Sequence, residues 1–211
     1  MLIDLRDAAL LDRGLMNAIV APRPIAWIGS QDASGRGNLA PFSHFNVASS
    51  APPVISVSMN TPDDRPRKDS LSNILETEVF SVNLVSESLL HRMVATSTAL
   101  PKGVDEAGEY GVATEPCDFV AAPRVVEAPA TLECRLYRVI DIDPEREGDT
   151  KSSLVLGRVI GIKLHDNCLD ERSRFDPRRA SLVARSAGIE YLTIRDTVQV
   201  AAPFRRAGDG P

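Results

Sequence analysis

The stretch APRPIAWIGSQDASGRGNLAPFSHFN, residues 21–46, decides the fold. Pro22 and Pro24 keep its entry extended, because proline fixes its own φ and keeps the preceding residue out of the helical region. We expect a short strand over 25–30, where the residues are β-prone. A turn should follow over 32–37, where glycines permit positive φ, so that the chain reverses direction there.

The returning segment over 38–47 is expected to be a second strand that Pro41 interrupts. Proline cannot donate a ladder hydrogen bond, so this position implies a strand edge, a bulge or a break. A break would free backbone amides and carbonyls beside the side chains of Asn38, Ser43 and Asn46. Such a mixture of donors and acceptors suits the edge of a flat ligand such as a flavin ring, and an ordinary hairpin is the structural alternative.

A second element, RPRKDSLSNI over 65–74, gathers positive charge at the start of an expected helix. Three of its first four residues are cations, namely Arg65, Arg67 and Lys68. Asp69 and Ser70 follow them and are typical N-cap residues. The unpaired amides of a helix N-terminus bind phosphate, and neighbouring cations add charge-assisted hydrogen bonds. The segment therefore predicts a phosphate site, and the alternative is a solvated basic loop.

Four motifs carry a resemblance to a known family: APRPIAWIGS, NLAPFSHFN, PPVISVSMN and RKDSLSNI. In this combination the chain resembles the flavin reductase-like family of FMN-binding split barrels, which includes the reductase components of two-component monooxygenases. The resemblance implies a fold that is mainly β with α, an FMN-binding split β-barrel with peripheral helices. It also implies a single domain over 1–211, with the barrel core at about 15–200. Ser70 and Ala187 stand where relatives often have threonine and glycine, and neither difference removes a ligand-binding group.

The resemblance further implies that FMN is the cofactor and that NAD(P)H transfers a hydride to it, so that reduced flavin can serve an oxygenase. Along the flavin ring and ribityl chain we expect Asn38, Ala40, Pro41 and Ser43, with Ser58 beside them. At the phosphate we expect Arg67, Lys68, Asp69 and Ser70. No catalytic side chain is named, because the cofactor carries the chemistry and the protein orients it.

Other activities on the same fold stay open. A non-catalytic FMN-binding protein would have the same ring and phosphate residues, and a flavin-dependent oxidase or oxygenase would use the flavin differently. We also expect a homodimer with each flavin near the subunit interface, because a β-rich wall with an interrupted strand leaves edges and apolar surface for a symmetric partner.

The composition fits one folded unit of ordinary size. The 211 residues are 43% hydrophobic, which suffices for one substantial core. A net charge of −5 argues against a nucleic-acid surface, and the sequence predicts neither a signal peptide nor a membrane span. Three cysteines, Cys117, Cys134 and Cys168, lack CxxC spacing, so neither a disulfide framework nor a zinc site is indicated and a reducing cytoplasm fits best.

Most of the remaining chain is expected to be β. Alternating apolar residues predict strands over 54–59 and 79–85, and a helix should follow over 86–95. The stretch over 115–129 contains three prolines and is expected to be a crossing connection. Beyond it we expect a long hairpin that forms a barrel wall, with strands over 130–142 and 153–165.

Other chemistries lack their sequence context. Residues 35–40 match the dinucleotide pattern GxGxxA, but Pro41 excludes the helix that this motif must open. No GxxxxGK[ST] or GxSxG motif is present, which disfavours nucleotide triphosphatases and serine hydrolases. The histidines have no metal-ligand spacing; His44 is a candidate wall residue beside the flavin, and His91 and His165 favour surface or structural positions.

Overall fold

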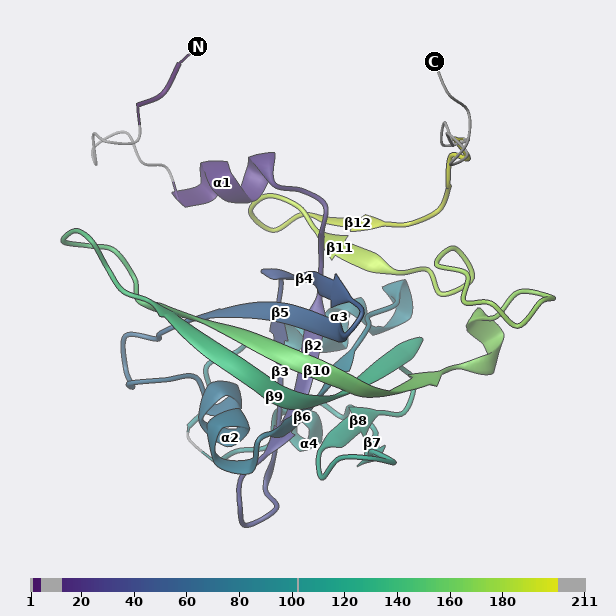
Figure 1. The fold of residues 1–211 in the computed structure, drawn as a ribbon, viewed down its shortest axis with the longest axis horizontal. Coiled ribbons are helices and arrows are strands. Elements are labelled where there is room, and N and C mark those ends of the chain that lie inside the picture. Colours follow the sequence, from purple (N-terminus) through teal and green to yellow (C-terminus); the bar gives the residue numbers. More distant parts are fainter. Residues whose placement is uncertain (1, 5–12, 102, 201–211) are drawn as a thin grey trace, which may run out of the picture.

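The computed structural model describes residues 2–4, 13–101 and 103–200, and it is mainly β with a few helices (Figure 1). Seven antiparallel strands form the main sheet, in the order β3-β2-β6-β9-β10-β5-β4. Their bounds are β2 Ala26–Gln31, β3 Gly37–Phe42, β4 Phe45–Ser50, β5 Pro53–Asn60, β6 Val79–Asn83, β9 Ala130–Ile142 and β10 Ser152–Leu164. The strands expected from the sequence are present with small shifts of their ends.

The two edge strands of this sheet, β3 and β4, are consecutive in the chain. Only Ser43 and His44 separate them, so the chain passes from one edge of the sheet to the other at this point. The sheet therefore curls until its edges approach, and β3 contacts β5, the neighbour of the other edge strand. A curled sheet whose edges approach without sharing a ladder is a split barrel, which confirms the predicted fold class.

Pro41 lies inside β3 and does not end it. It pairs in register with Trp27 of β2, and β3 has no strand on its other side. The Leu39 amide points away from β2 to the carboxylate of Glu106, and the two-residue repeat of a strand gives Pro41 the same orientation. The proline therefore costs no ladder hydrogen bond. Of the alternatives that the sequence left open, the strand edge is the correct one, and the interruption comes later, at the passage to β4.

Strand β2 is buried on both faces, and it separates two apolar clusters. Ala26 and Ile28 belong to the cluster that joins the sheet to α2 Asp69–Thr77. Trp27 belongs to the cluster that joins the sheet to α3 Leu90–Ala95 and α4 Glu106–Glu109. A slip of one residue would exchange the two faces, so this double burial fixes the register of the strand that pairs with β3.

Helices cover the sheet and form its connections. The first is α1 Arg13–Ile19, and the expected helix over 86–95 consists of a 3₁₀ turn, η2 Glu87–Leu89, followed by α3. A second 3₁₀ turn is η3 Asp166–Cys168. Helix α2 packs against β2 and β3 through Leu71 and Ile74, which are both buried. None of the described helices is long and apolar enough to cross a membrane.

The start of α2 differs from the prediction. The N-cap residue is Lys68, and its side chain makes no capping hydrogen bond. The prediction that Asp69 and Ser70 are the N-cap residues is wrong, because both belong to the first helical turn. Their side chains have other partners: the Asp69 carboxylate accepts from Arg65, and the Ser70 hydroxyl accepts from Asn38.

Two smaller sheets complete the fold. One contains β1 Arg23–Pro24, β11 Val183–Arg185 and β12 Tyr191–Thr193, and the other is a hairpin of β7 Thr114–Pro116 and β8 Pro123–Val125. The connection expected over 115–129 therefore contains a hairpin. Pro116 and Pro123 pair with each other at the end of its short ladder, where proline is tolerated. Figure 1 shows β11 and β12 beside α1, above β4.

Strands β9 and β10 form the long hairpin that the sequence predicts. Figure 1 shows them crossing the molecule, with their turn projecting at one end. Gly157 of β10 lies against the Phe80 ring, and a Cβ at this glycine would come within 2.4 Å of the ring. The glycine therefore permits a close approach between the long hairpin and the core.

Candidate functional site

A pocket of about 260 Å³ opens between β3, the first turn of α2 and residues 96–100, and we call it the Lys68 pocket. It brings together these predicted binding residues: Asn38, Ala40, Pro41, Lys68, Asp69 and Ser70. The rest of its lining comes from Phe42, Pro62, Asp64, Arg65, residues 96–100 and Glu106. The structure thus joins the two sequence elements, 21–46 and 65–74, in one site.

Asn38 and Ser70 connect these two elements directly. Asn38 Nδ2 donates to Ser70 Oγ at 2.9 Å, and both side chains are buried. This hydrogen bond holds β3 against the first turn of α2. Each side chain satisfies a polar group of the other. The hydrogen bond therefore fixes the distance between the open strand edge and the helix N-terminus.

The free positive charge of the Lys68 pocket belongs to Lys68 itself. Arg65 also lines the pocket, but its guanidinium donates to the carboxylates of Asp64 and Asp69, each at 2.8 Å. Hydrogen bonding to Asp64 raises the pKa of Arg65, and the two acids offset its charge. Lys68 is exposed and forms no ion pair with a described residue. One free ammonium beside the unpaired first amides of α2 suits a phosphate group.

Glu106 closes the Lys68 pocket on the side of β3. Its side chain is buried, and Oε2 accepts from the Leu39 amide at 2.9 Å. Burial is the main cause that raises the pKa of Glu106, and the hydrogen bond from Leu39 opposes this shift. Asp105 and Asp69 add smaller upward contributions. The ionised form of Glu106 therefore opposes an anion in this pocket, and its neutral form does not.

The open edge of β3 supplies acceptors rather than donors. The Leu39 amide is already bonded, and Pro41 has no amide, whereas the carbonyls of both residues point to the open side. Donors to a ligand must then come from nearby side chains. Ser97 donates to the Val94 carbonyl, but the hydroxyls of Ser43 and Thr98 make no hydrogen bond to a described residue.

A second pocket continues along β3 from the first, and we call it the Arg185 pocket. Its volume is about 480 Å³. It shares Pro41, Phe42 and Ser97 with the Lys68 pocket. Its wall is apolar at Ile25, Pro41, Phe42 and Met93 and polar at Asn17, Arg23, Ser43, Ser97, Arg185, Ser186 and Tyr191. A half-apolar cleft of this size with a few polar groups is typical of small-molecule sites.

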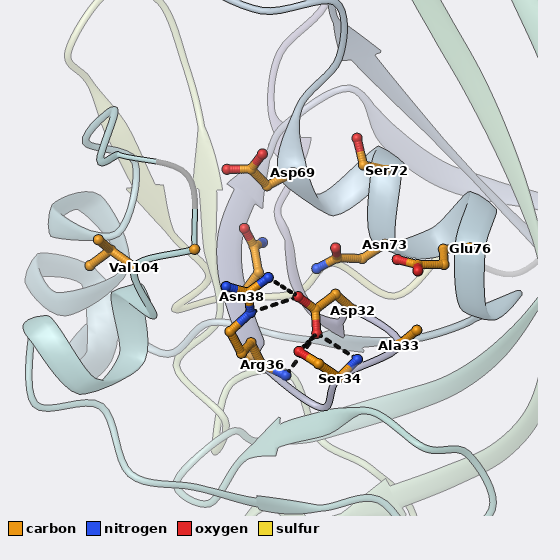
Figure 2. Close-up of a pocket in the computed structure, with 12 residues that line it drawn as sticks. Asp32, Ala33, Ser34, Arg36, Asn38, Asp69, Ser72, Asn73, Glu76 and Val104 are labelled. Carbon is orange, nitrogen blue, oxygen red and sulfur yellow. Dashed lines mark hydrogen bonds and ion pairs between the residues drawn. The ribbon is translucent and has the colours of Figure 1, made fainter.

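Figure 2 shows a third pocket, the Asp32 pocket, between the β2–β3 turn and α2. It adjoins the Lys68 pocket, because Asn38 and Asp69 line both. Asp32 accepts from Ser34 and from Arg36, and these hydrogen bonds lower its pKa. Asp69 and Glu76 line the same space, and the nearby arginine is already paired with Asp32. This acidic lining does not suit a phosphate.

Two predicted binding residues lie outside the Lys68 and Arg185 pockets. Arg67 is exposed, and its charge makes a minor contribution to the lowered pKa of Asp141, which a hydrogen bond from Ser153 mainly causes. Ser58 is half-buried in β5, where it pairs in register with Leu154. The structure therefore does not bring these two side chains into the cleft.

Other candidate side chains are placed as follows. His44 lies at the passage between β3 and β4, with Nε2 at 2.9 Å from Oδ1 of Asn17. Burial and the charge of Arg23 lower the pKa of His44. His91 is exposed on α3, as expected, and Trp27 is fully buried in the core.

Two parts of the cleft were not predicted from the sequence. The first is residues 96–100, where the buried Thr96 accepts from Trp27 Nε1 at 2.9 Å and donates to the Met93 carbonyl at 2.8 Å. The hydroxyl run TST after the predicted helix was the available signal. The second is the pairing of Arg23 with Arg185: Arg23 belongs to the APRPIAWIGS motif, but no local pattern indicates that it lies opposite a residue near the other end of the chain.

Thiol and metal chemistry find no support among the described residues. No group of three or more histidines, cysteines, aspartates or glutamates in this part of the chain could hold a metal ion. The three cysteines are free, and burial raises the pKa of Cys117 to about 12. A thiol with this pKa is not a thiolate near neutral pH.

The chemistry of the lining fits a flavin mononucleotide. A free ammonium and open amides stand at one end, carbonyls and hydroxyls line the middle, and an apolar wall with polar groups lies at the other end. These are the donor sets that a phosphate, a polyol chain and a flat heteroaromatic ring require.

Comparisons with known proteins agree with this geometry. A family model described as Flavin reductase like domain matches residues 17–180. An uncharacterized protein of Aquifex aeolicus is 34% identical over 178 residues, which cover 84% of this chain and 87% of the relative. The structure of 2-nitrobenzoate 2-nitroreductase from Pseudomonas fluorescens has a TM-score of 0.79 at 29% identity, covering 96% of this chain and 98% of that chain. Nitrilotriacetate monooxygenase component B from Bacillus cereus has a TM-score of 0.85 at 25% identity, covering 95% and 99%.

Proposed function

We propose that this chain, which belongs to the flavin reductase-like domain family, binds FMN along β3 and transfers a hydride to it from NAD(P)H. The family is one of flavin-binding oxidoreductases, and the choice of FMN and of NAD(P)H is our own inference. One observation carries it: the Lys68 pocket, with its free ammonium and the open amides of α2, adjoins the Arg185 pocket and shares Pro41, Phe42 and Ser97 with it.

In this proposal the phosphate binds at Lys68 and the first turn of α2. The ribityl chain follows Asn38 and Ala40, and the ring lies along Pro41 and Ser43. Asp69 and Ser70 contribute backbone amides. Arg67 acts through its charge. Ser58 acts through its amide, which holds the His44 carbonyl just before β4.

The mononucleotide is favoured over a dinucleotide flavin by what adjoins the phosphate end. A second phosphate would extend from the Lys68 pocket toward the Asp32 pocket, because these two share lining residues. There it would meet the carboxylates of Asp32 and Glu76, which do not line the Lys68 pocket. Like charges at short range in a partly buried site are unfavourable, so the lining supports FMN over FAD.

When bound, FMN supplies the ring that accepts the hydride from NAD(P)H. The residues of this chain bind and orient. Lys68 fixes the phosphate end, and the hydrogen bond between Asn38 and Ser70 sets its distance from the strand edge. Phe42 and Met93 exclude water from one side of the cleft. Positioning is enough for hydride transfer, so no side chain needs to act as acid, base or nucleophile.

We propose that the reduced flavin serves an oxygenase partner. The support is the structure from Bacillus cereus, which is named as component B of a monooxygenase. A second candidate is direct reduction of an organic substrate, for which the nitroreductase from Pseudomonas fluorescens is named. The Arg185 pocket supports this alternative, because its lining offers a half-apolar space beyond the shared residues of the cleft.

We also propose a cytoplasmic homodimer. Large apolar side chains are exposed on several strands and on α1, among them Met16, Val47, Tyr137, Ile160 and Ile162. A symmetric partner would remove this surface from water. Light scattering on FMN-loaded protein tests the assembly: a mass near the 22.8 kDa of one chain would contradict it.

The activity is tested by removing the flavin. The purified protein should oxidise NADH or NADPH when FMN is retained or supplied, and removal of FMN should abolish the rate. Restoring FMN to the same sample should restore the rate, which excludes damage during removal. Equal NAD(P)H oxidation by the flavin-free protein would contradict the proposal.

A further inference from the structure

Two arginines lie directly opposite each other where β1 and β11 pair. Arg23 of β1 pairs in register with Arg185 of β11, and both line the Arg185 pocket. Like charges opposite each other on antiparallel strands destabilise a sheet. Burial lowers the pKa of Arg23, and the charge of Arg185 lowers it further. The fold thus retains an unfavourable pair of charges at the wall of a pocket.

The hydrogen-bond partners of Arg23 among the described residues are all uncharged. Nη1 donates to the carbonyls of Asn17 and Val20, which belong to the end of α1 and the residues after it, and Nη2 donates to the Ser186 carbonyl at 2.8 Å. Nε is buried and makes no hydrogen bond to a residue that the structure describes. The carbonyls satisfy several donors and fix the side chain, but they leave a full positive charge in place.

The partners of Arg185 are also uncharged. Its guanidinium donates to the Tyr191 hydroxyl and to the Gly188 carbonyl, and it lies over the Tyr191 ring at 4.5 Å from the centroid. In the described part of the chain no carboxylate forms an ion pair with Arg185 or with Arg23. Among the described residues, the pocket therefore contains two positive charges and no charged partner for either.

Arg124 shows the contrasting case in the same protein. It is 7% exposed, close to the 8% of Arg23. Yet it forms ion pairs with Glu115 at 2.9 Å and with Asp118, and Glu133 lies at 3.7 Å. A buried arginine with a structural role is thus surrounded by acids here. Within the part of the chain that the structure describes, the absence of an acid beside Arg23 and Arg185 therefore distinguishes this pocket from the site of Arg124.

We propose that Arg23 and Arg185 form an anion site that binds the carboxylate or phosphate group of the second substrate. The uncharged part of this substrate lies against Phe42 and Met93, on the apolar wall of the same pocket. The inference rests on the proposed function for the position of the flavin, which occupies the adjoining cleft. The oxyanion supplies the counter-charge that no described residue provides, and a guanidinium pair is well suited to bind it.

Calorimetric titration of three probes into the FMN-loaded protein tests the site. Benzoate and benzamide share a ring and differ in charge, and NAD⁺ carries its charge as a diphosphate. If the anion is a carboxylate, benzoate should bind more tightly than benzamide. Arg185→Gln should then lower the affinity for benzoate roughly tenfold or more. If the anion is a phosphate, Arg185→Gln should lower the affinity for NAD⁺ by the same factor. The control is Arg172→Gln, an exposed arginine outside this pocket, which should change neither affinity.

Two results would overturn the site. One is equal binding of benzoate and benzamide together with NAD⁺ affinity that is unchanged in Arg185→Gln; the other is an equal loss in both arginine variants. If Arg185→Gln does not fold, thermal unfolding of the wild type decides, because only the anionic probes should raise its midpoint. Repeating the titrations on flavin-free protein separates this site from the proposed function: a difference between benzoate and benzamide there supports the arginine pair even if FMN does not bind.

Discussion

Asn38 Nδ2 donates to Ser70 Oγ at 2.9 Å between side chains that are 32 residues apart in the sequence and both buried. The hydrogen bond ties the open edge of β3 to the first turn of α2. These are the two places where we position the ring and the phosphate of the flavin. The length of the proposed binding site is therefore fixed inside the protein, before any ligand is bound.

Replacing the acceptor of this bond should destabilise the protein. Ser70→Ala leaves the Asn38 amide buried without its partner, which costs about 1–3 kcal/mol of unfolding free energy. Urea unfolding of the flavin-free protein measures the change. Ser72→Ala, in the same helix but half-buried and without a side-chain hydrogen bond to a described residue, should stay within about 0.5 kcal/mol. Equal effects of the two substitutions would show that the bond adds no stability.

Removal of the free cation should weaken FMN binding selectively. Lys68→Ala deletes one charge-assisted hydrogen bond to the phosphate, worth about 1.5–3 kcal/mol. FMN affinity should then fall roughly ten- to hundred-fold. Riboflavin has the same ring without the phosphate, so its weaker affinity should hardly change. Fluorescence titration of both flavins measures the difference.

The neighbouring cation provides the matched control for this experiment. Arg67 is exposed and does not line the Lys68 pocket, so Arg67→Ala should reduce FMN affinity less than Lys68→Ala does. Circular dichroism should confirm a native fold for both variants. An unchanged FMN affinity in Lys68→Ala, or an equal loss of affinity for FMN and riboflavin, would contradict the phosphate site. It would favour the alternative that residues 65–74 form a solvated basic loop.

Glu106 should make both stability and FMN affinity depend on pH. Burial raises the pKa of Glu106 above its usual value of 4.5, so the folded state holds this proton more tightly than the unfolded state does. The contribution of Glu106 to stability is therefore greatest below 4.5 and is lost as the pH rises through the raised pKa. FMN affinity should fall over the same range, because the ionised carboxylate opposes the phosphate.

Glu106→Gln isolates this effect. Glutamine still offers an oxygen to the Leu39 amide but cannot ionise, so the variant should lack the part of the pH dependence that comes from this side chain. Urea unfolding and FMN titration at several pH values, on wild type and variant, measure it. Parallel pH profiles of the two proteins would assign the dependence to other groups.

A glycine substitution tests the close packing behind the site. A Cβ on Gly29 of β2 would lie 2.1 Å from the Pro123 carbonyl oxygen, which already accepts from Ser81 at 2.6 Å. Gly29→Ala should therefore cost about 1–3 kcal/mol or more, since backbone must move. Gly37→Ala, in the same hairpin, meets its nearest atom at an ordinary 3.5 Å from Asp105 and should be nearly neutral. Thermal unfolding compares them, and a neutral Gly29→Ala would contradict the packing described.

The sequence predicts the strands well because their signals are local. The alternation over 54–59 and the long runs over 130–142 and 153–165 report which side chains face a core, and the structure has strands at all three places. The turn over 32–37 and the cations before α2 are local signals as well. The two elements of the proposed flavin site could therefore be found without knowledge of how the chain packs.

The remaining features depend on residues that are distant in the sequence. That Pro41 faces an open edge follows from the bond between the Leu39 amide and Glu106, which packing alone determines. The cap of α2 was misplaced because Asp69 and Ser70 bind side chains, not backbone amides. Likewise no local pattern reveals that β1 and β11, from opposite ends of the chain, meet at a pocket.

The central claim is that the cleft along β3 holds FMN and lets NAD(P)H reduce it. The most direct measurement mixes FMN-loaded protein anaerobically with NADH and, separately, with NADPH, and follows the visible absorbance of the flavin. The account predicts rapid bleaching with at least one of the two, much faster than for free FMN under the same conditions. Bleaching no faster than that of free FMN with both nucleotides would contradict the account and leave a non-catalytic FMN-binding protein.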